Sequence, residues 1–228
     1  MSFLEVKNLN INLKKNKANL VNDLSFNIEK GEVVLLAGRN GSGKSSILRT
    51  IMLERIKTMV VKGDIFYNNQ NILKFRKEKD IFDYRRSISY IPQLDNFEGY
   101  YNMNVNDVLQ ESIDSFNGEK AEIDEIKLLL EKLQKDAHED FRFDFNSNPS
   151  ELSGGQQRIV TILANFIARP GADFYIIDEP FNNLDESNTS IVINLIKEMH
   201  LKYPSSTFLI VTHPHQEKFD FITRKIYL

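Results

Sequence analysis

The chain has 228 residues, of which 41% are hydrophobic and 27% are charged, and its formal net charge is -3. This length allows one large or two modest domains with a substantial core, and the nearly balanced charge argues against a polycationic or polyanion-binding tail. Cysteine is absent, which excludes disulfide bonds and thiolate metal sites.

The sequence carries no signal for membrane insertion or secretion. No stretch approaches about 18 consecutive apolar residues, and residues 1–5 lack the basic and apolar parts of a signal peptide. We therefore expect a cytoplasmic protein whose role at a membrane would need a partner. The basic residues Lys14, Lys15 and Lys17 indicate a short solvated turn, so no nucleic acid partner is expected.

The first third of the chain predicts strands around one helix. Apolar and polar residues alternate at 3–9 and 24–28, which predicts strands of a half-exposed sheet. The apolar run 32–37 predicts a buried strand, and apolar residues at helical spacing across 47–52 predict the helix after it.

The rest of the chain alternates strands and helices around a helical insert. The predicted elements are, in order, a strand at 63–67, a charged helical stretch at 72–86, a strand at 88–91, helices from 105 to about 138, a polar loop at 140–150, a helix from Ser153, a strand at 174–177, a helix with an apolar face across 192–199, a strand at 207–211 and a final strand at 221–228. This order indicates an α/β domain with a largely parallel central sheet. The early strands add an antiparallel part, and the insert adds a second lobe.

Residues 38–45 read GRNGSGKS, a complete G-x-x-x-x-G-K-[ST] phosphate loop on the strand-to-helix turn that the motif requires. Its glycines let backbone N–H groups approach phosphate oxygens, and the new helix adds its positive N-terminal end. Lys44 should reach the β- and γ-phosphates of a nucleotide, and the Ser45 hydroxyl should bind Mg²⁺. An accidental glycine-rich turn has a chance on the order of 1% or less. The candidate nucleotide-binding residues are Gly38, Arg39, Asn40, Gly41, Ser42, Gly43, Lys44, Ser45 and Ser46.

Two carboxylates follow the predicted strand at 174–177. Asp178 and Glu179 stand at its end, which is where phosphates bind in open α/β sheets. Asp178 suits Mg²⁺ bound through water, and Glu179 can act as general base on an attacking water. An ordinary strand-end turn explains the pair equally well on its own, but the phosphate loop in the same chain favours the catalytic interpretation.

Residues 152–156 read LSGGQ and open a helix. Ser153 and Gln156 fit a capping box, which would explain the string by local structure alone. A capping box does not need Gly154 and Gly155, however, and glycine costs helix stability. Two glycines at a helix start would expose backbone N–H groups to an incoming anion.

Together these strings resemble an ABC-type ATPase domain, and the resemblance covers essentially the whole chain. The family's motifs occur in its order: the phosphate loop as Walker A, Gln93 after Pro92 as the Q-loop, Leu152 to Gln156 as the signature, Asp178 and Glu179 as Walker B, residues 183–185 as the D-loop and His213 as the switch histidine. The resemblance implies one P-loop NTPase domain over 1–228. It would have a RecA-like core, an antiparallel β subdomain and a helical subdomain inserted at about 95–165.

The resemblance also implies a mechanism that needs two chains. Two such domains sandwich two ATP molecules head to tail, as a homodimer or a heterodimer. Ser153, Gly154 and Gly155 of one chain, in the signature that ends at Gln156, would contact the γ-phosphate held by Lys44 of the other.

The remaining motifs would complete each ATP site. Gln93 would join Ser45 and Asp178 around Mg²⁺ and the attacking water, while Asp185 would couple the two sites across the dimer. A helix N-cap is the structural alternative for Asp185, and both roles can hold at once.

Among the four histidines, only His213 has the strand-end position expected of the switch. It would hold the γ-phosphate and position water against Glu179. We expect His138 and His200 to be surface residues of helices and His215 to be a loop residue.

The sequence departs from the family pattern in three places. An aromatic residue that stacks on adenine in the family corresponds here to Leu13, which offers apolar contact without stacking. The helix at 157–165 lacks the usual Ala-Arg-Ala, a change of packing more than of chemistry. The chain stops at its last predicted strand, so no regulatory domain is expected after it.

The leading functional hypothesis is the ATPase subunit of a transporter, peripheral on the inner face of the cell membrane. ATP would close the dimer and move transmembrane permease subunits. The candidate contact surface is 95–104, where Phe97, Tyr100 and Tyr101 suit an interface, although core packing explains them equally well.

Two other classes compete with this hypothesis. A soluble ABC ATPase of a cofactor- or cluster-assembly complex stays open, whereas DNA-repair members carry a long coiled coil and ribosome-bound members usually carry two cassettes. A binding module without turnover is disfavoured because Glu179 and His213 are both present.

Overall fold

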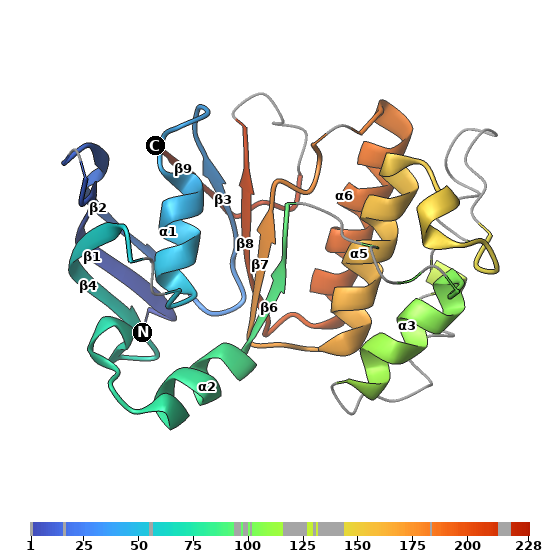
Figure 1. Ribbon diagram of the computed structural model, residues 1–228, viewed down its shortest axis with the longest axis horizontal. Coiled ribbons are helices and arrows are strands. Elements are labelled where there is room, and N and C mark those ends of the chain that lie inside the picture. The colour runs from blue at the N-terminus through green and yellow to red at the C-terminus, as the bar shows by residue number, and fades with distance from the viewer. Residues whose placement is uncertain are drawn as a thin grey trace. The chain divides into compact units, whose positions relative to one another are not determined.

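The computed structural model describes residues 2–15, 17–54, 57–93, 97, 100, 102–115, 127–129, 131, 144–182, 184–213 and 220–228. The chain folds into two compact units (Figure 1). The first unit comprises Met1–Ile88 and Ser205–Leu228, and the second comprises Ser89–Pro204. In the described part of the chain, no helix is long and apolar enough to cross a bilayer.

The first unit contains an antiparallel sheet with strand order β2-β1-β4-β5. Its strands are β1 (Leu4–Leu13), β2 (Asn19–Ile28), β4 (Met59–Tyr67) and β5 (Gln70–Asn71). The predicted antiparallel part is therefore present, but β1 and β2 are longer than the predicted 3–9 and 24–28.

A β-bulge explains why the alternation in the sequence underestimates β1. Asn8 adopts φ 46°, and the register with β4 shifts between Lys7 and Asn10, so the strand changes phase there. Leu9 consequently stays on the buried face that begins at Leu4. Opposite the bulge, a Cβ on Gly63 would lie 2.5 Å from the Asn8 carbonyl oxygen, so this position needs glycine.

The first unit also contains three parallel strands. These are β3 (Val33–Ala37), β8 (Thr207–Thr212) and β9 (Arg224–Tyr227), with β3 paired to both of the others. Every residue of β3 and β8 is buried, which agrees with the unbroken apolar runs typical of central parallel strands. Helix α1 (Lys44–Ile51) follows β3.

The predicted helical stretch at 72–86 is interrupted. The 3-10 helix η1 (Ile72–Lys74) and helix α2 (Glu78–Arg86) are separated by extended backbone at Phe75 and Lys77. Helix α2 caps the end of α1: the Tyr84 hydroxyl donates to the Ile51 carbonyl at 2.8 Å, and Arg85 donates to the Met52 and Leu53 carbonyls. These bonds satisfy carbonyls that a helix end leaves without partners.

The second unit carries strands β6 (Ile88–Ile91) and β7 (Phe174–Asp178), which are neighbours in their sheet. Its helices are α3 (Val105–Asp114), the 3-10 helix η2 (Pro149–Glu151), α5 (Gly154–Ala168) and α6 (Glu186–Lys202), and α5 packs against both α3 and α6. The predicted apolar face of α6, from Val192 to Met199, is buried.

The predicted helical insert lies entirely within the second unit. Helix α3 and the helical residues 127–129 and 131 agree with helices from 105 to 138, and the other residues between 116 and 140 lie outside the described ones. The boundaries 95 and 165 stay a prediction.

Candidate nucleotide-binding site

The phosphate loop lies where β3 ends and α1 begins, as the sequence predicts. Gly41 and Gly43 adopt φ 79° and 93°, the left-handed region that favours glycine. A Cβ on Gly41 would meet nothing within 4 Å, whereas a Cβ on Gly43 would lie 2.5 Å from the Leu20 carbonyl oxygen. Gly43 caps α1 without a side-chain hydrogen bond, which leaves the N–H groups of the first turn to a ligand.

Lys44 places its ammonium group inside this loop. The side chain is 7% exposed, and its Nζ donates to the carbonyl oxygens of Gly38 at 2.7 Å and Arg39 at 3.3 Å. Ser42 Oγ is buried and finds no hydrogen-bond partner among the described residues. A buried cation and an orphaned hydroxyl beside uncapped N–H groups fit a bound polyphosphate. Ser45, Arg39, Asn40 and Gly41 are exposed, and Ser46 is half-buried.

His213 leaves the sheet beside the phosphate loop. Strands β3 and β8 pair in parallel with Ala37 opposite Thr212, so Gly38 and His213 are the residues that directly follow the two strands. The strand-end position expected for His213 is confirmed, and its side chain is half-buried.

The carboxylate pair lies in the second unit at the end of β7, again as predicted. Asp178 and Glu179 are each 5% exposed. The Tyr90 hydroxyl on β6 donates to Asp178 Oδ2 at 3.3 Å, a contact that orients this carboxylate. Glu179 adopts φ 46°. A residue other than glycine in this region costs about 1 to 3 kcal/mol, and such strain clusters at functional sites.

Arg158 is a site residue that the sequence reasoning missed. It lies on α5 and is 2% exposed, and its guanidinium donates to the carbonyl oxygens of Pro92, Asp178 (2.9 Å) and Pro180 (3.4 Å). The signal that could have found it is a charged residue on the apolar face of a predicted helix, four residues before the buried Ile162.

The signature residues begin α5 with the predicted capping box. Ser153 Oγ accepts from the Gln156 N–H at 3.3 Å, and Gln156 Oε1 accepts from the Ser153 N–H at 3.0 Å. The two glycines differ in environment. A Cβ on Gly154 would meet nothing within 4 Å, whereas a Cβ on Gly155 would lie 2.5 Å from Asn188 Nδ2 on α6. Space is thus open around Gly154, whereas a side chain at position 155 would have to displace the Asn188 side chain.

Asp185 is the N-cap of α6, which is the structural alternative for this residue. Its Oδ1 accepts from the Asn188 N–H at 2.7 Å, and its Oδ2 accepts from Asn188 Nδ2 at 2.9 Å. The side chain is exposed, so the cap does not bury the carboxylate. Asn183 of the predicted D-loop lies outside the described residues.

The remaining predicted residues are only partly described. Gln93 is exposed directly after Pro92. Phe97 and Tyr100 are half-buried and meet edge to face with ring centroids 6.2 Å apart, while Asp95 and Tyr101 lie outside the described residues. Leu13 is half-buried at the end of β1.

The histidines other than His213 are not all as expected. His200 is half-buried on α6 rather than a surface residue, and burial lowers the pKa of its imidazole. His138 and His215 lie outside the described residues.

The predicted site residues therefore divide between the units. The phosphate loop and His213 belong to the first unit, and Gln93, Ser153 to Gln156, Asp178, Glu179 and Asp185 belong to the second. Among the described residues, no group of three or more His, Cys, Asp or Glu is placed to hold a metal ion. Proteins commonly bind Mg²⁺ through only one or two carboxylates plus substrate phosphates, so a magnesium site with ATP does not need such a group.

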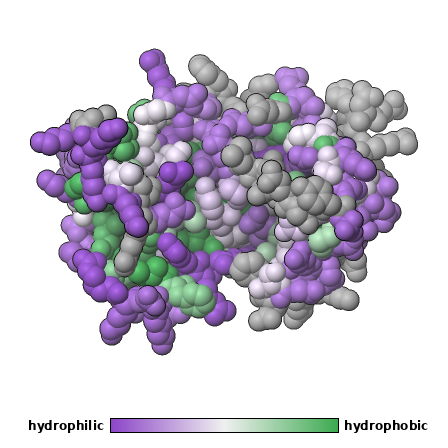
Figure 2. Space-filling model, viewed as in Figure 1, coloured by the Kyte–Doolittle hydropathy of each residue, from purple (hydrophilic) through white to green (hydrophobic). Residues whose placement is uncertain are grey.

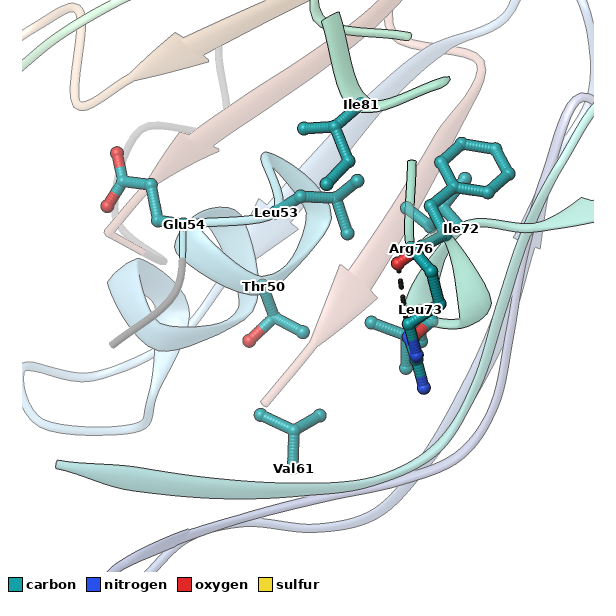
Figure 3. A pocket seen from close by; sticks show the side chains of 9 residues that line it. Thr50, Leu53, Glu54, Val61, Ile72, Leu73, Arg76 and Ile81 are labelled. Atoms are coloured by element: carbon teal, nitrogen blue, oxygen red, sulfur yellow. Dashed lines mark hydrogen bonds between the residues drawn. The ribbon is translucent and has the colours of Figure 1, made fainter. Parts of the chain in front are cut away.

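A separate pocket of about 340 Å³ lies at the other end of α1 (Figure 3). Apolar side chains from β4, η1, α2 and the segments that directly follow α1 and η1 line it, together with Thr50, Glu54 and Arg76. Apolar side chains also gather on the part of the surface in Figure 2 that belongs to the first unit. The pocket contains none of the predicted nucleotide-binding residues.

Comparison with known proteins agrees with the resemblance. The ABC transporter family model matches residues 21–182. The chain is 33% identical over 221 residues to the methionine import ATP-binding protein of Lactobacillus acidophilus, covering 93% of this chain and 59% of that protein. It is 30% identical to the ergothioneine transport ATP-binding protein of Helicobacter pylori, covering 98% and 96%. The chain thus spans less than two thirds of the first relative and nearly all of the second.

Solved structures show the same fold. A dimeric ATP-binding cassette in a post-hydrolysis state, bound to ADP and Pi, superimposes with a TM-score of 0.72 at 25% identity, covering 99% of this chain and 94% of that one. The cbiO1 subunit of an ABC transporter complex from Clostridium perfringens also matches, with a TM-score of 0.66 at 27% identity over 93% and 78% of the chains. The chain belongs to the ABC transporter family and has the fold of that family's ATP-binding cassette, the ATPase part of these transporters.

Proposed function

We propose that the chain is the ATP-hydrolysing subunit of an ABC transporter. The observation that carries this proposal is the phosphate loop, in which the buried Lys44 ammonium and the uncapped start of α1 form a cradle for a polyphosphate. The family of the chain and the names of its relatives, which include import and transport ATP-binding proteins, support the same conclusion.

Hydrolysis would use ATP together with Mg²⁺. Bound Mg²⁺ would neutralise phosphate charge and align the oxygens of the reaction. Ser45, Gln93 and Asp178 would hold the ion, with Tyr90 fixing the Asp178 carboxylate through their hydrogen bond. Glu179 would take the proton of the attacking water.

The γ-phosphate would be held from both sides of a dimer. Lys44 and His213 of one chain would contact it directly, and Ser153 and Gly154 of a second chain would present the start of α5 to it. The open space around Gly154 supports this role, as does the dimeric cassette among the structural relatives. The second chain can be identical or a related ATPase subunit.

The dimer would act on transmembrane permease subunits from the inner face of the membrane. The segment 95–104 is the proposed contact, and the half-buried pair of Phe97 and Tyr100 gives it an aromatic element. ATP-driven closure would move this segment together with the permease.

A Glu179→Gln variant tests the proposal. Without the base, ATP should persist, and the variant should elute as a dimer with Mg-ATP while turnover falls by about 10²- to 10⁴-fold. Lys44→Ala in the same background is the control and should abolish the ATP-dependent dimer. Unchanged turnover of Glu179→Gln would show that Glu179 is not the general base. Recovery of only soluble partners from a detergent extract would overturn the transporter assignment.

A further inference from the structure

The Glu179 backbone is held on both sides by one side chain. The Arg158 guanidinium donates to the carbonyl oxygens of Asp178 and Pro180, the residues directly before and after Glu179. Glu179 itself lies in the left-handed region at φ 46°. A strained conformation persists only where its surroundings determine it, and these two bonds supply such a constraint.

The same guanidinium reaches the segment that precedes Gln93. Arg158 also donates to the Pro92 carbonyl oxygen, so a single side chain connects the ends of β6 and β7. It is 2% exposed. A planar guanidinium has five donors in a fixed fork and can serve three carbonyls at once, whereas a lysine ammonium cannot reproduce that geometry.

Arg158 belongs to the helix that begins at the signature. The capping box fixes Ser153 at the start of α5, and Arg158 lies in the second turn of the same helix. A displacement of this helix start, where the second chain's nucleotide would bind, would therefore carry Arg158 and its three carbonyl partners with it.

We propose that Arg158 is a positioning residue that sets the conformation of Glu179 and couples it to the signature helix and to the Gln93 segment. The inference rests on the proposed function, since it assigns Arg158 a part in the same hydrolysis. The guanidinium would act through its hydrogen bonds to the backbone on either side of Glu179.

The test is a double-mutant cycle on the full chain, with Arg158→Lys, Glu179→Gln and the two combined. Arg158→Lys keeps the charge and removes the fork. We expect kcat for ATP hydrolysis to fall about tenfold or more, up to the 10²- to 10⁴-fold contribution of a general base, while the Kd for ATP changes less than about twofold. In the Glu179→Gln background the same change should leave the residual rate unaltered, because the group that Arg158 positions is already gone.

Arg86→Lys on the exposed face of α2 is the matched control and should leave kcat at the wild-type value. A purely structural role for Arg158 predicts an equal fall of kcat in both backgrounds, and that result would overturn the inference. Should Arg158→Lys not fold, Arg158→Gln, which retains one amide donor group, replaces it in the same cycle. A wild-type chain without ATPase activity would overturn the proposed function and the inference together, whereas an active wild type with an equally active Arg158→Lys would overturn the inference alone.

Discussion

The phosphate loop and the carboxylate turn at the end of β7 are organised in opposite ways. The loop is built from contiguous residues: Lys44 donates to the carbonyls of Gly38 and Arg39, six and five residues away. The turn at Glu179 depends on residues far away in the sequence. Tyr90 donates a hydrogen bond to Asp178, 88 residues away, and Arg158 donates one to Pro180, 22 residues away. A motif found in the sequence therefore describes the loop almost completely and the turn only in part.

The largest expected effect comes from removing the cation at the centre of the loop. Lys44→Ala takes away the charge that would meet the phosphates, and we expect ATP hydrolysis to fall by about 10³-fold. Steady-state turnover and binding of a fluorescent nucleotide measure the loss, with Lys62→Ala, an exposed residue of β4, as the control. A Lys44→Ala chain that hydrolyses ATP normally would show that the loop does not work through this side chain.

The glycines of the loop give the next largest effect, this time on stability. Gly43→Ala would combine a left-handed φ with a Cβ 2.5 Å from the Leu20 carbonyl, so the free energy of unfolding should fall by about 3 kcal/mol. Gly41→Ala has the positive φ without the contact and should cost only about 1 kcal/mol. Urea denaturation of the two variants measures the difference, and equal losses would contradict the role given to the contact.

The signature glycines provide a similar pair in the second unit. Gly155→Ala should displace Asn188, weaken its bond to Asp185 and lower the free energy of unfolding by about 1 to 2 kcal/mol. Gly154→Ala should stay within about 0.5 kcal/mol of wild type. The double variant of Gly155→Ala with Asn188→Ala should lose less stability than the sum of the two single variants. The reason is that the Asn188 side chain, which the new Cβ at position 155 would meet, is absent from the double variant.

The smallest expected effect is the pH dependence contributed by His200. Burial lowers the pKa of this imidazole in the folded chain, so the unfolded chain binds its proton more readily. The contribution of the neutral His200 imidazole to stability is therefore complete above the ordinary pKa of 6.5 and is lost as the pH falls below that pKa. Denaturation midpoints on either side of that value should differ less for His200→Gln than for wild type, and an equal or larger difference would contradict the direction.

The same contrast explains how much of the fold the sequence predicts. The buried runs of β3, β7 and β8, the phosphate loop and the capping box at Ser153 depend on adjacent residues, and all are present as predicted. The bulge at Asn8 is not visible in a period-two pattern, because it depends on the register with β4 around Gly63. Tyr90, Arg158 and Asn188 were missed because none of them belongs to a motif and each meets a motif residue far away in the sequence. Tyr90 and Arg158 meet Asp178, and Asn188 meets Gly155.

The cap that α2 places on the end of α1 has a consequence for how nucleotide binding could be transmitted. Helix α1 has only eight residues, with the phosphate loop at its first turn and the Tyr84 and Arg85 side chains on the carbonyls at its end. A movement of its first turn would thus be resisted at the far end by the contacts with α2. After α2 the chain enters β6 at Ile88 and reaches Gln93 five residues later. The hydrogen bonds of Tyr84 and Arg85 therefore join the C-terminal end of α1 to the helix that leads into β6 and Gln93.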